Sequence, residues 1–418
     1  MRKLLKNEDW LAFFSGIIVV LAAWAGFYFP SVKFGWSDAG SLKDLFTSTG
    51  NLNGIGGMLL LLICAGLATF FLGKKNITQL VVTILIVFTM SLISQGLAGY
   101  KPVKYYGFEY VIFALIAGII VRNVFGLPKW LAENLHSEFF IKTGLVILGS
   151  GIIFGDIIKA GALGLVQAIV VVLAVWFFAY WIAKKLKVDD EMALMLSSAV
   201  SICGVSAAIA TAGAIKGDGK KLSYVVSLVL IVALPMLILL PIAARYMGLN
   251  PAQAGAWFGG TIDTSGAVVA SGTIFGEEAL KFSTIVKFSQ NVLIGFAAVA
   301  ISVFWVLKGR KDDISGKDQK VDFRIIWQRF PKFVLGFIAA SLIYSFLVDP
   351  VSIAATKDYL KGIQTAFFAV AFVGIGLETD FSLLIKTGSG RPAWAFLIAQ
   401  CFNILFTLLL AYYLFMKV

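Results

Sequence analysis

The chain has 418 residues, of which 59% are hydrophobic and 14% are charged, and its formal net charge is +12 at pH 7. Soluble domains carry about 45–50% apolar and about 25% charged residues, so this composition excludes an ordinary soluble protein. Apolar runs of about 20 residues recur along the chain, and each is long enough to cross a hydrocarbon core about 30 Å thick. The sequence therefore predicts an all-α polytopic membrane protein.

The hydropathy pattern predicts a single integral membrane domain, 1–418, with about 11–13 transmembrane segments. The first apolar run follows "MRKLLKNED" and is longer than the apolar part of a signal peptide, so we interpret it as a retained span. In chain order, the thirteen candidate spans are 10–30, 56–73, 77–99, 106–125, 141–155, 162–183, 190–214, 222–246, 253–275, 282–307, 331–348, 363–378 and 392–415.

The basic residues predict how these spans are oriented, because Lys and Arg collect in cytoplasmic loops. With the N-terminus in the cytoplasm, the basic groups at 74–75 and 184–187 and the loop 308–332 all fall on the cytoplasmic side. One loop disagrees, since "KGDGKK" at 216–221 would then lie outside. A span next to it is therefore either re-entrant or miscounted.

Two similar stretches indicate an internal repeat. "GSGIIFGDIIKAG" (149–161) and "GIGLETDFSLLIKTG" (374–388) share a Gly-x-Gly helix end, an acidic residue and an Ile-Lys-x-Gly ending. They lie seven predicted spans apart, so they run in opposite directions, as in the inverted repeats of many secondary transporters. We predict that 144–183 and 368–415 superpose after inversion. The alternative is that Gly-x-Gly only ends helices while Lys snorkels to the interface.

The stretch "SAVSICGVSAAIATAG" (198–213) is unusually rich in small and hydroxyl-bearing residues. Ser197, Ser201 and Gly204 lie at i, i+4 and i+7, on one helical face. Small residues allow close helix packing in lipid, which is one explanation. The other is a helix broken near the middle of the bilayer, where irregular backbone is tolerated only if protein or a water-filled cavity surrounds it. We predict such an interruption within 200–207.

A second small-residue stretch, "GGTIDTSGAVVASG" (259–272), contains a carboxylate inside an apolar span. Asp263 is flanked by Gly259, Gly260 and Gly266, which permit local unwinding. An ionisable side chain at bilayer depth is costly and indicates a functional site by default. The alternative is an aspartate bonded to a neighbouring helix for structure alone. We predict a second helix interruption within 259–266.

The next span, in "KFSTIVKFSQNVLIGF", carries a polar stripe with a cation at its centre. Thr284, Lys287 and Asn291 share one helical face, and Gln290 lies beside them. Lys287 either snorkels to the interface, pairs with Asp263 or offers its charge to an anion. Because the chain has one histidine and three cysteines without metal-ligand spacing, we predict no cofactor, no metal site and no enzymatic activity.

Several of these stretches together resemble the YeiH family, also called UPF0324: "VRNVFGLP", "SICGVSAAIATAGAIKGD", "WFGGTIDTSGAVVASGTIFG", "STIVKFSQNVLI" and "VGIGLETDFSLLIKTG". The resemblance implies a multi-pass transporter of the bacterial inner membrane, assigned to sulfate export. It also implies a core domain with two crossing broken helices, packed on a scaffold domain, as in cation/proton antiporters and bile-acid symporters. One position departs from the family pattern Ile-His-Asp-Thr: Asp263 stands where the histidine would be, and Thr264 where the aspartate would be.

The residues and the resemblance together predict a secondary active transporter of a small anion, such as sulfate or a related sulfur oxyanion. The expected partners are that anion, the lipid bilayer and a second copy bound through the scaffold domain, with no nucleic acid. Asp263 is the predicted ligand of a coupling ion, H⁺ or Na⁺. The alternatives are a cation/proton antiporter that uses Asp263 and an anion channel. The predicted substrate-binding residues are Ser201, Cys203, Gly204, Ser206, Gly260, Thr261, Thr264, Ser265, Lys287, Gln290 and Asn291.

Overall fold

The computed structural model describes the chain except for residues 1–6, 73–75, 106–107, 310–323 and 381–389. Over the described residues the regular secondary structure is helical, and the β-type pairing is a single isolated bridge between Trp36 and Tyr100. Most of the predicted basic loop 308–332, the lysines at 74–75 and the end of the second repeat copy lie outside the described residues.

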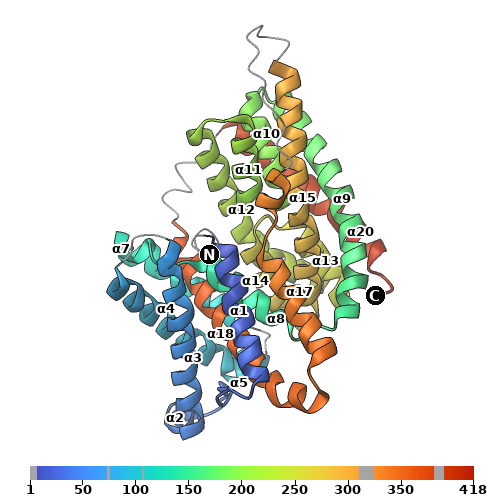
Figure 1. Cartoon of the computed structure of the whole chain (residues 1–418). Coiled ribbons are helices and arrows are strands. Elements are labelled where there is room, and N and C mark those ends of the chain that lie inside the picture. Colours follow the sequence, from blue (N-terminus) through green and yellow to red (C-terminus); the bar gives the residue numbers. More distant parts are fainter. Residues whose placement is uncertain (1–6, 73–75, 106–107, 310–323, 381–389) are drawn as a thin grey trace. The chain divides into compact units, whose positions relative to one another are not determined.

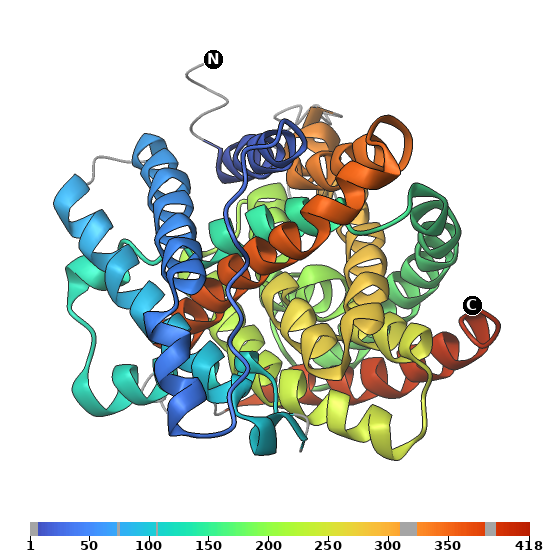
Figure 2. The same ribbon diagram turned by 90° about the horizontal axis from the view of Figure 1, so that it is seen from below.

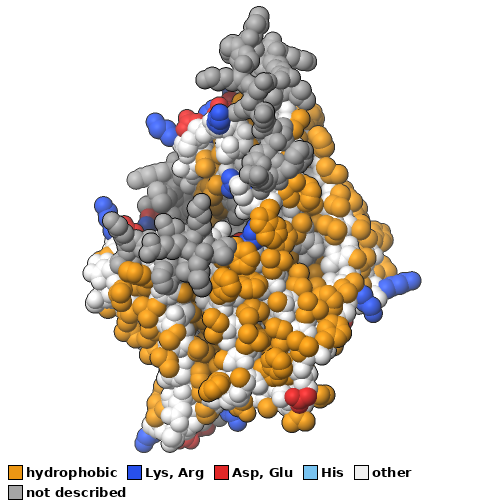
Figure 3. Space-filling view, in the orientation of Figure 1, with side chains coloured by type: hydrophobic (Ala, Val, Ile, Leu, Met, Phe, Trp, Pro, Cys, Tyr) orange, Lys and Arg blue, Asp and Glu red, His pale blue; other side chains and the backbone are white. Residues whose placement is uncertain are grey.

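Seven of the described helices are long and apolar enough to cross a membrane. Figure 3 shows hydrophobic side chains over much of the coloured surface, as expected where the surrounding solvent is lipid. These features confirm the all-α polytopic membrane class, while the exact number of spans and the inverted repeat stay predictions. The seven helices are α3 (Thr49–Ala68), α4 (Ile77–Gly99), α9 (Phe154–Lys185), α12 (Gly219–Tyr246), α15 (Glu277–Gly309, apolar up to Trp305), α18 (Pro350–Glu378) and α20 (Arg391–Leu414).

The chain forms two compact units, and the first comprises residues 1–156 and 332–380. Its most buried long helix is α18, which packs against α4, α6 (Tyr110–Ile120) and α8 (Ser137–Gly149). Gly118 of α6 and Gly376 of α18 lie backbone against backbone, where a β-carbon on either would collide with the other helix. Figures 1 and 2 show α3 and α4 side by side in this unit. This unit also contains α1 (Glu8–Trp24), α2 (Ala39–Thr47) and α17 (Phe333–Leu342).

The second unit comprises residues 157–331 and 381–418. The chain passes between the units after Asp156, after Pro331 and after Asp380, and the first and third of these crossings lie inside the two copies of the Gly-x-Gly repeat. Besides α9, α12, α15 and α20, this unit contains α10 (Asp190–Ser198), η3 (Ala199–Cys203), α11 (Val205–Ile215), α13 (Pro251–Thr261), α14 (Ser265–Phe275) and α16 (Arg324–Arg329).

Residues 190–215 do not cross unit 2 as one span: the helix that begins at Asp190 ends at Cys203 and α11 begins at Val205, within the range 200–207 where an interruption was predicted. The chain turns at Gly204, and α11 packs back against α10. At the open end, Lys221 Nζ lies 2.7 Å from Asp189 Oδ1 and 3.2 Å from Glu191 Oε2, which joins the start of α10 to the first turn of α12, the helix that follows α11. The predicted span 190–214 is therefore wrong: this segment, which we call hairpin 1, enters and leaves unit 2 at the same end. That geometry accounts for the anomalous loop 216–221.

Residues 251–275 fold back in the same way, as hairpin 2. Gly255 of α13 and Gly272 of α14 both pack against residues 279–283 of α15, although 17 residues of continuous helix would separate them by about 25 Å. The rings of Phe258 and Phe275 lie 5.8 Å apart. The predicted span 253–275 therefore does not cross unit 2 as one segment: α13 ends at Thr261 and α14 begins at Ser265, within the range 259–266 where an interruption was predicted.

The two hairpins enter unit 2 from opposite ends. Helix α12 joins them, and its 28 residues span about 42 Å. Its first residue follows Asp218 beside hairpin 1, while Arg245 near its other end donates to the Ile274 carbonyl of hairpin 2 at 2.6 Å. Figure 1 shows α10 and α11 at one end of α12, and α13 and α14 towards the other. The turns of both hairpins consequently point into the middle of the unit.

Candidate functional site

The turns of the two hairpins meet. Gly204, at the turn of hairpin 1, has a φ of 57°, a conformation that L side chains rarely adopt. A β-carbon at this position would lie 3.0 Å from Asp263 Cβ at the turn of hairpin 2, and 2.6 Å from Val229 Cγ1 of α12. Glycine is thus required here both by the backbone conformation and by the close approach of Asp263.

Three buried side chains connect the hairpins by donating to backbone carbonyls at the ends of their first arms. Lys287 Nζ donates to the carbonyls of Ile202 and Ile262, both at 2.8 Å. Gln290 Nε2 donates to those of Ser201 at 2.9 Å and Gly260 at 3.2 Å. Asn403 Nδ2 donates to those of Val200 at 3.0 Å and Thr261 at 3.3 Å. Each donor therefore binds one carbonyl from each hairpin.

This arrangement solves a problem that an interrupted helix creates in lipid. The last carbonyls of a helix have no partner within it, and they carry the negative end of the helix dipole. Two such ends meet here, away from water, and Lys287 supplies a positive charge between them. The Lys287 side chain is only 1% exposed, and Gln290 Oε1 accepts its third hydrogen bond at 2.8 Å. With all three ammonium donors engaged, direct contact between Lys287 and a substrate stays a prediction.

Asp263 is the other ionisable group at the turns. It is 2% exposed, and its Oδ2 atom is buried without a hydrogen-bond partner. The ion pairs among the described residues do not include one between Asp263 and Lys287. A buried carboxylate without a bonded partner is costly, which favours a proton or a cation as its partner in part of the protein's working cycle.

The second arms of both hairpins begin at the turns, so two helix N-termini also converge there. Thr264 is the N-cap of α14, and its hydroxyl accepts from Ala267 N at 3.3 Å. Ser206 in the first turn of α11 is exposed, while Thr264 and Ser265 are half-buried. Asn291 Nδ2 of α15 lies 3.4 Å from Ser265 Oγ. Ser206, Thr264 and Ser265 form the accessible, donor-rich side of the turns, and the buried Asn291 borders it.

The structure divides the predicted substrate-binding residues into two sets. Ser206, Thr264 and Ser265 lie around the N-termini on the accessible side, and Asn291, which is buried, contacts Ser265 there. The others are buried, and the Ser201 hydroxyl donates to the Ser197 carbonyl of its own helix at 2.7 Å. The buried set, at the carbonyl ends and the turn of hairpin 1, comprises Ser201, Cys203, Gly204, Gly260, Thr261, Lys287 and Gln290.

Three amides at this site were not predicted from the sequence. Asn403 binds the carbonyl ends as described and is itself held by the Thr407 hydroxyl at 2.8 Å. Gln400 Nε2 donates to the Thr261 carbonyl at 3.0 Å, and Gln167 Nε2 of α9 donates to the Ala256 carbonyl at 2.8 Å. The available signal was the spacing of Gln400, Asn403 and Thr407 at i, i+3 and i+7 within an apolar span, which marks one polar face.

The described residues contain no group of three or more His, Cys, Asp or Glu side chains arranged to hold a metal ion. The chemistry that this site offers is that of hydrogen-bond donors, helix dipoles, one carboxylate and one ammonium. Such groups bind and release an ion without making or breaking covalent bonds.

Apolar membrane-length helices and two opposed re-entrant hairpins define a multi-pass helical membrane protein. The family model described as conserved hypothetical protein 698 matches residues 57–395. Curated relatives carry the name UPF0324 membrane protein, and the chain belongs to this family, which confirms the resemblance seen in the sequence.

The matched regions include most of this chain but a smaller share of each relative's own length. A relative from Rhodopirellula baltica is 37% identical over 79% of the chain and 62% of its own length. One from Nitratidesulfovibrio vulgaris is 36% identical over 85% of the chain and 63% of its own length. A Nitrosomonas europaea relative is 33% identical, covering 70% and 66% respectively. The chain thus spans less than two thirds of the length of these relatives, and no solved structure matches it.

Proposed function

We propose that this protein is a secondary transporter that carries a small anion across a bacterial inner membrane, with its N-terminus in the cytoplasm. Sulfate and related sulfur oxyanions are the candidate substrates. The observation that carries this proposal is the convergence of two half-length helices, α11 and α14, whose N-termini begin at meeting turns. Discontinuous helices of this kind form the substrate sites of many secondary transporters.

The accessible side of the turns suits an anion. Each helix N-terminus carries roughly half a positive elementary charge, and its first N–H groups have no partner within the helix. The hydroxyls of Ser206 and Ser265 lie in the first turns of α11 and α14, and that of Thr264 lies at the N-cap. An oxyanion bound there receives backbone and hydroxyl hydrogen bonds together, as at other helix N-termini.

Lys287 acts in this proposal by holding the other side of the turns together. Its ammonium binds the carbonyl ends of both hairpins, so its charge offsets their negative dipole ends. Without that charge, two negative helix ends would lie close to the anion. Lys287 is thus a positioning residue for the N-termini and a source of positive potential.

Asp263 supplies the coupling. An anion and an ionised carboxylate about 6 Å apart repel by about 3 kcal/mol at an effective dielectric constant of about 20. Anion binding therefore favours neutralisation of Asp263 by H⁺ or Na⁺. The two ions are then bound together and travel in the same direction.

A cation/proton antiporter is the second candidate, because the unpartnered Oδ2 atom of Asp263 is suited to binding a cation. The carbonyl ends argue against it. A dehydrated Na⁺ needs several oxygen ligands, and six carbonyls near the turns already accept hydrogen bonds from Lys287, Gln290 and Asn403.

Flux measurements in proteoliposomes separate these functions. Sulfate, sulfite, a small organosulfonate and Na⁺ are offered in turn under imposed pH gradients. The proposal requires saturable anion uptake with counterflow, and Asp263→Asn must alter its dependence on pH or Na⁺ more than its anion affinity. Na⁺ flux without anion flux would show instead that the protein is a cation/proton antiporter. Single-channel anion currents that do not saturate would show that it is a channel.

A further inference from the structure

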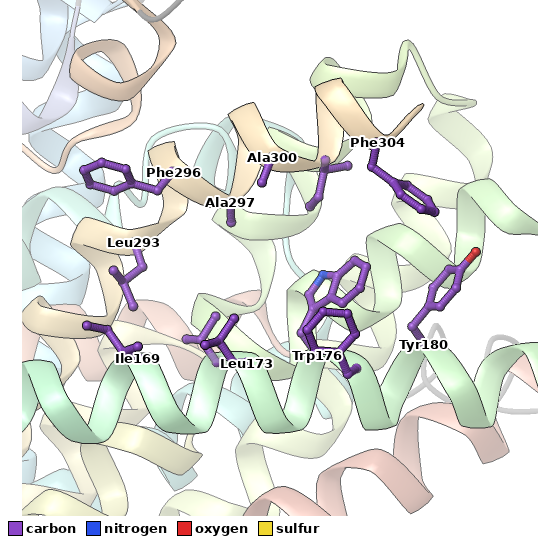
Figure 4. A pocket seen from close by; sticks show the side chains of 12 residues that line it. Ile169, Leu173, Trp176, Tyr180, Leu293, Phe296, Ala297, Ala300 and Phe304 are labelled. Atoms are coloured by element: carbon purple, nitrogen blue, oxygen red, sulfur yellow. The ribbon is translucent and has the colours of Figure 1, made fainter. Parts of the chain in front are cut away.

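A groove between α9 and α15 lies outside the site described above. Its volume is about 450 Å³, and it is formed within unit 2. Figure 4 shows the two helices running alongside each other with their side chains pointing into the space between them. The lining residues are Ile169, Val172, Leu173, Trp176, Phe177 and Tyr180 of α9, and Leu293, Phe296, Ala297, Ala300, Ile301 and Phe304 of α15.

The groove offers its occupant apolar contact and little else. The two lining side chains that carry a polar atom are Trp176 and Tyr180. Trp176 Nε1 donates to Ser198 Oγ at 3.2 Å, and the Tyr180 hydroxyl donates to Asp190 Oδ1 at 3.3 Å. Because both polar atoms bind the protein, the ligand that fits this groove is a hydrocarbon.

The groove is also open to the surrounding membrane. Leu173, Phe177 and Phe296 are 55%, 64% and 53% exposed, so its walls are not covered by other parts of the described chain. Along α9 it extends from Ile169 to Tyr180, eleven residues or about 16 Å. That length is close to half of a hydrocarbon core about 30 Å thick, which is the depth of one lipid leaflet.

One end of the groove has the features of a membrane–water interface. Immediately beyond Tyr180, α9 continues through Trp181 to a basic end. Lys185 Nζ lies 5.0 Å from the centre of the Trp181 ring, and Lys185 and Lys187 are both exposed. Tyr, Trp and Lys are the residues that mark the interface in membrane proteins. Lys184, by contrast, is paired with Asp190 at 2.7 Å.

We propose that this groove binds a bilayer phospholipid with an anionic headgroup. One acyl chain fills the groove between α9 and α15, and the headgroup phosphate lies near Lys185 and Lys187. The apolar lining, the one-leaflet length and the basic end each match one part of this molecule. This site is separate from the anion site at the hairpin turns and does not depend on the proposed transport activity.

The bound lipid would support hairpin 1. Val172 lines the groove and also belongs to a buried cluster with Ile202 and Cys203, the residues just before the turn. Leu293 and Ala297 line the groove and pack against the same cluster. A hydrocarbon chain in the groove therefore completes the packing behind the first arm of the hairpin.

The test uses the full-length protein, purified in a mild detergent, and measures bound phosphatidylglycerol by native mass spectrometry. Ala300→Trp places a large side chain in the groove, and we expect it to weaken phosphatidylglycerol binding at least tenfold. Ala162→Trp is the matched control, because Ala162 is also exposed and lies on α9 but does not line the groove. Equal binding by the two variants would overturn the proposal.

The headgroup is tested separately. Replacing both Lys185 and Lys187 by Ser should weaken phosphatidylglycerol binding on the order of 30-fold while leaving phosphatidylcholine binding unchanged. If the double variant weakens binding of both lipids equally, or of neither lipid, the assignment of the headgroup to the basic end is overturned. A dimer that Ala300→Trp dissociates would identify the occupant as a second copy of the chain and would likewise refute the lipid proposal.

Discussion

Replacing Lys287 by Met tests whether this side chain holds the two hairpins together. The substitution keeps the apolar stem and removes the three hydrogen bonds to Ile202, Ile262 and Gln290. Two buried carbonyls then lose a donor, at about 1–3 kcal/mol each. Asp263 also loses a nearby positive charge, and although the two side chains form no ion pair, the lost attraction adds to this cost. We therefore expect a loss on the order of 5 kcal/mol, a large part of the total stability of a folded domain.

Thermal unfolding of the detergent-solubilised protein measures this loss. We expect Lys287→Met to lower Tm on the order of 10 °C, and Lys281→Met to leave Tm nearly unchanged. Lys281 is the matched control because it is half-buried on the same helix and makes none of these contacts with the hairpin turns. Adding Asp263→Asn to Lys287→Met should recover part of the loss, since it removes the uncompensated charge. If Lys287→Met and Lys281→Met have the same Tm, the bridging role of Lys287 is refuted.

Three further predictions concern the hairpins. Gly204→Ala should lower Tm more than Gly248→Ala. Both glycines have positive φ, but a β-carbon at Gly204 would collide with Val229 and Asp263, whereas a β-carbon at Gly248 meets open space. Equal Tm values for the two variants would contradict this prediction. Cysteines introduced at Lys187 and Lys220 should react with an impermeant maleimide from the same side of the membrane. Labelling from opposite sides would show that residues 190–214 cross the membrane as one span. In a background without the native cysteines, Ser206→Cys should react readily, and the transported anion should slow that reaction; an inert thiol would remove Ser206 from the site.

The sequence alone determined the class of the protein and the places where its chemistry would lie. Composition and long apolar runs require a helical membrane protein, because each lipid-exposed backbone group must be satisfied within its own segment. Asp263 and Lys287 were identifiable because ionisable groups are expensive at that depth. The small-residue stretches around Gly204 and Asp263 were also visible, since glycine and hydroxyl residues stand out against an apolar background.

Only the tertiary structure decided that these stretches are hairpins with meeting turns. A hydropathy window cannot distinguish one crossing helix from two half-length helices that fold back, because both bury the same apolar residues. The basic loop 216–221 indicated the discrepancy, but its pairing with Asp189 and Glu191 resolved it. Likewise, the sequence does not reveal which backbone carbonyls need a donor. Lys287, Gln290 and Asn403 became partners of those carbonyls only when helices distant in sequence brought them within 3.3 Å.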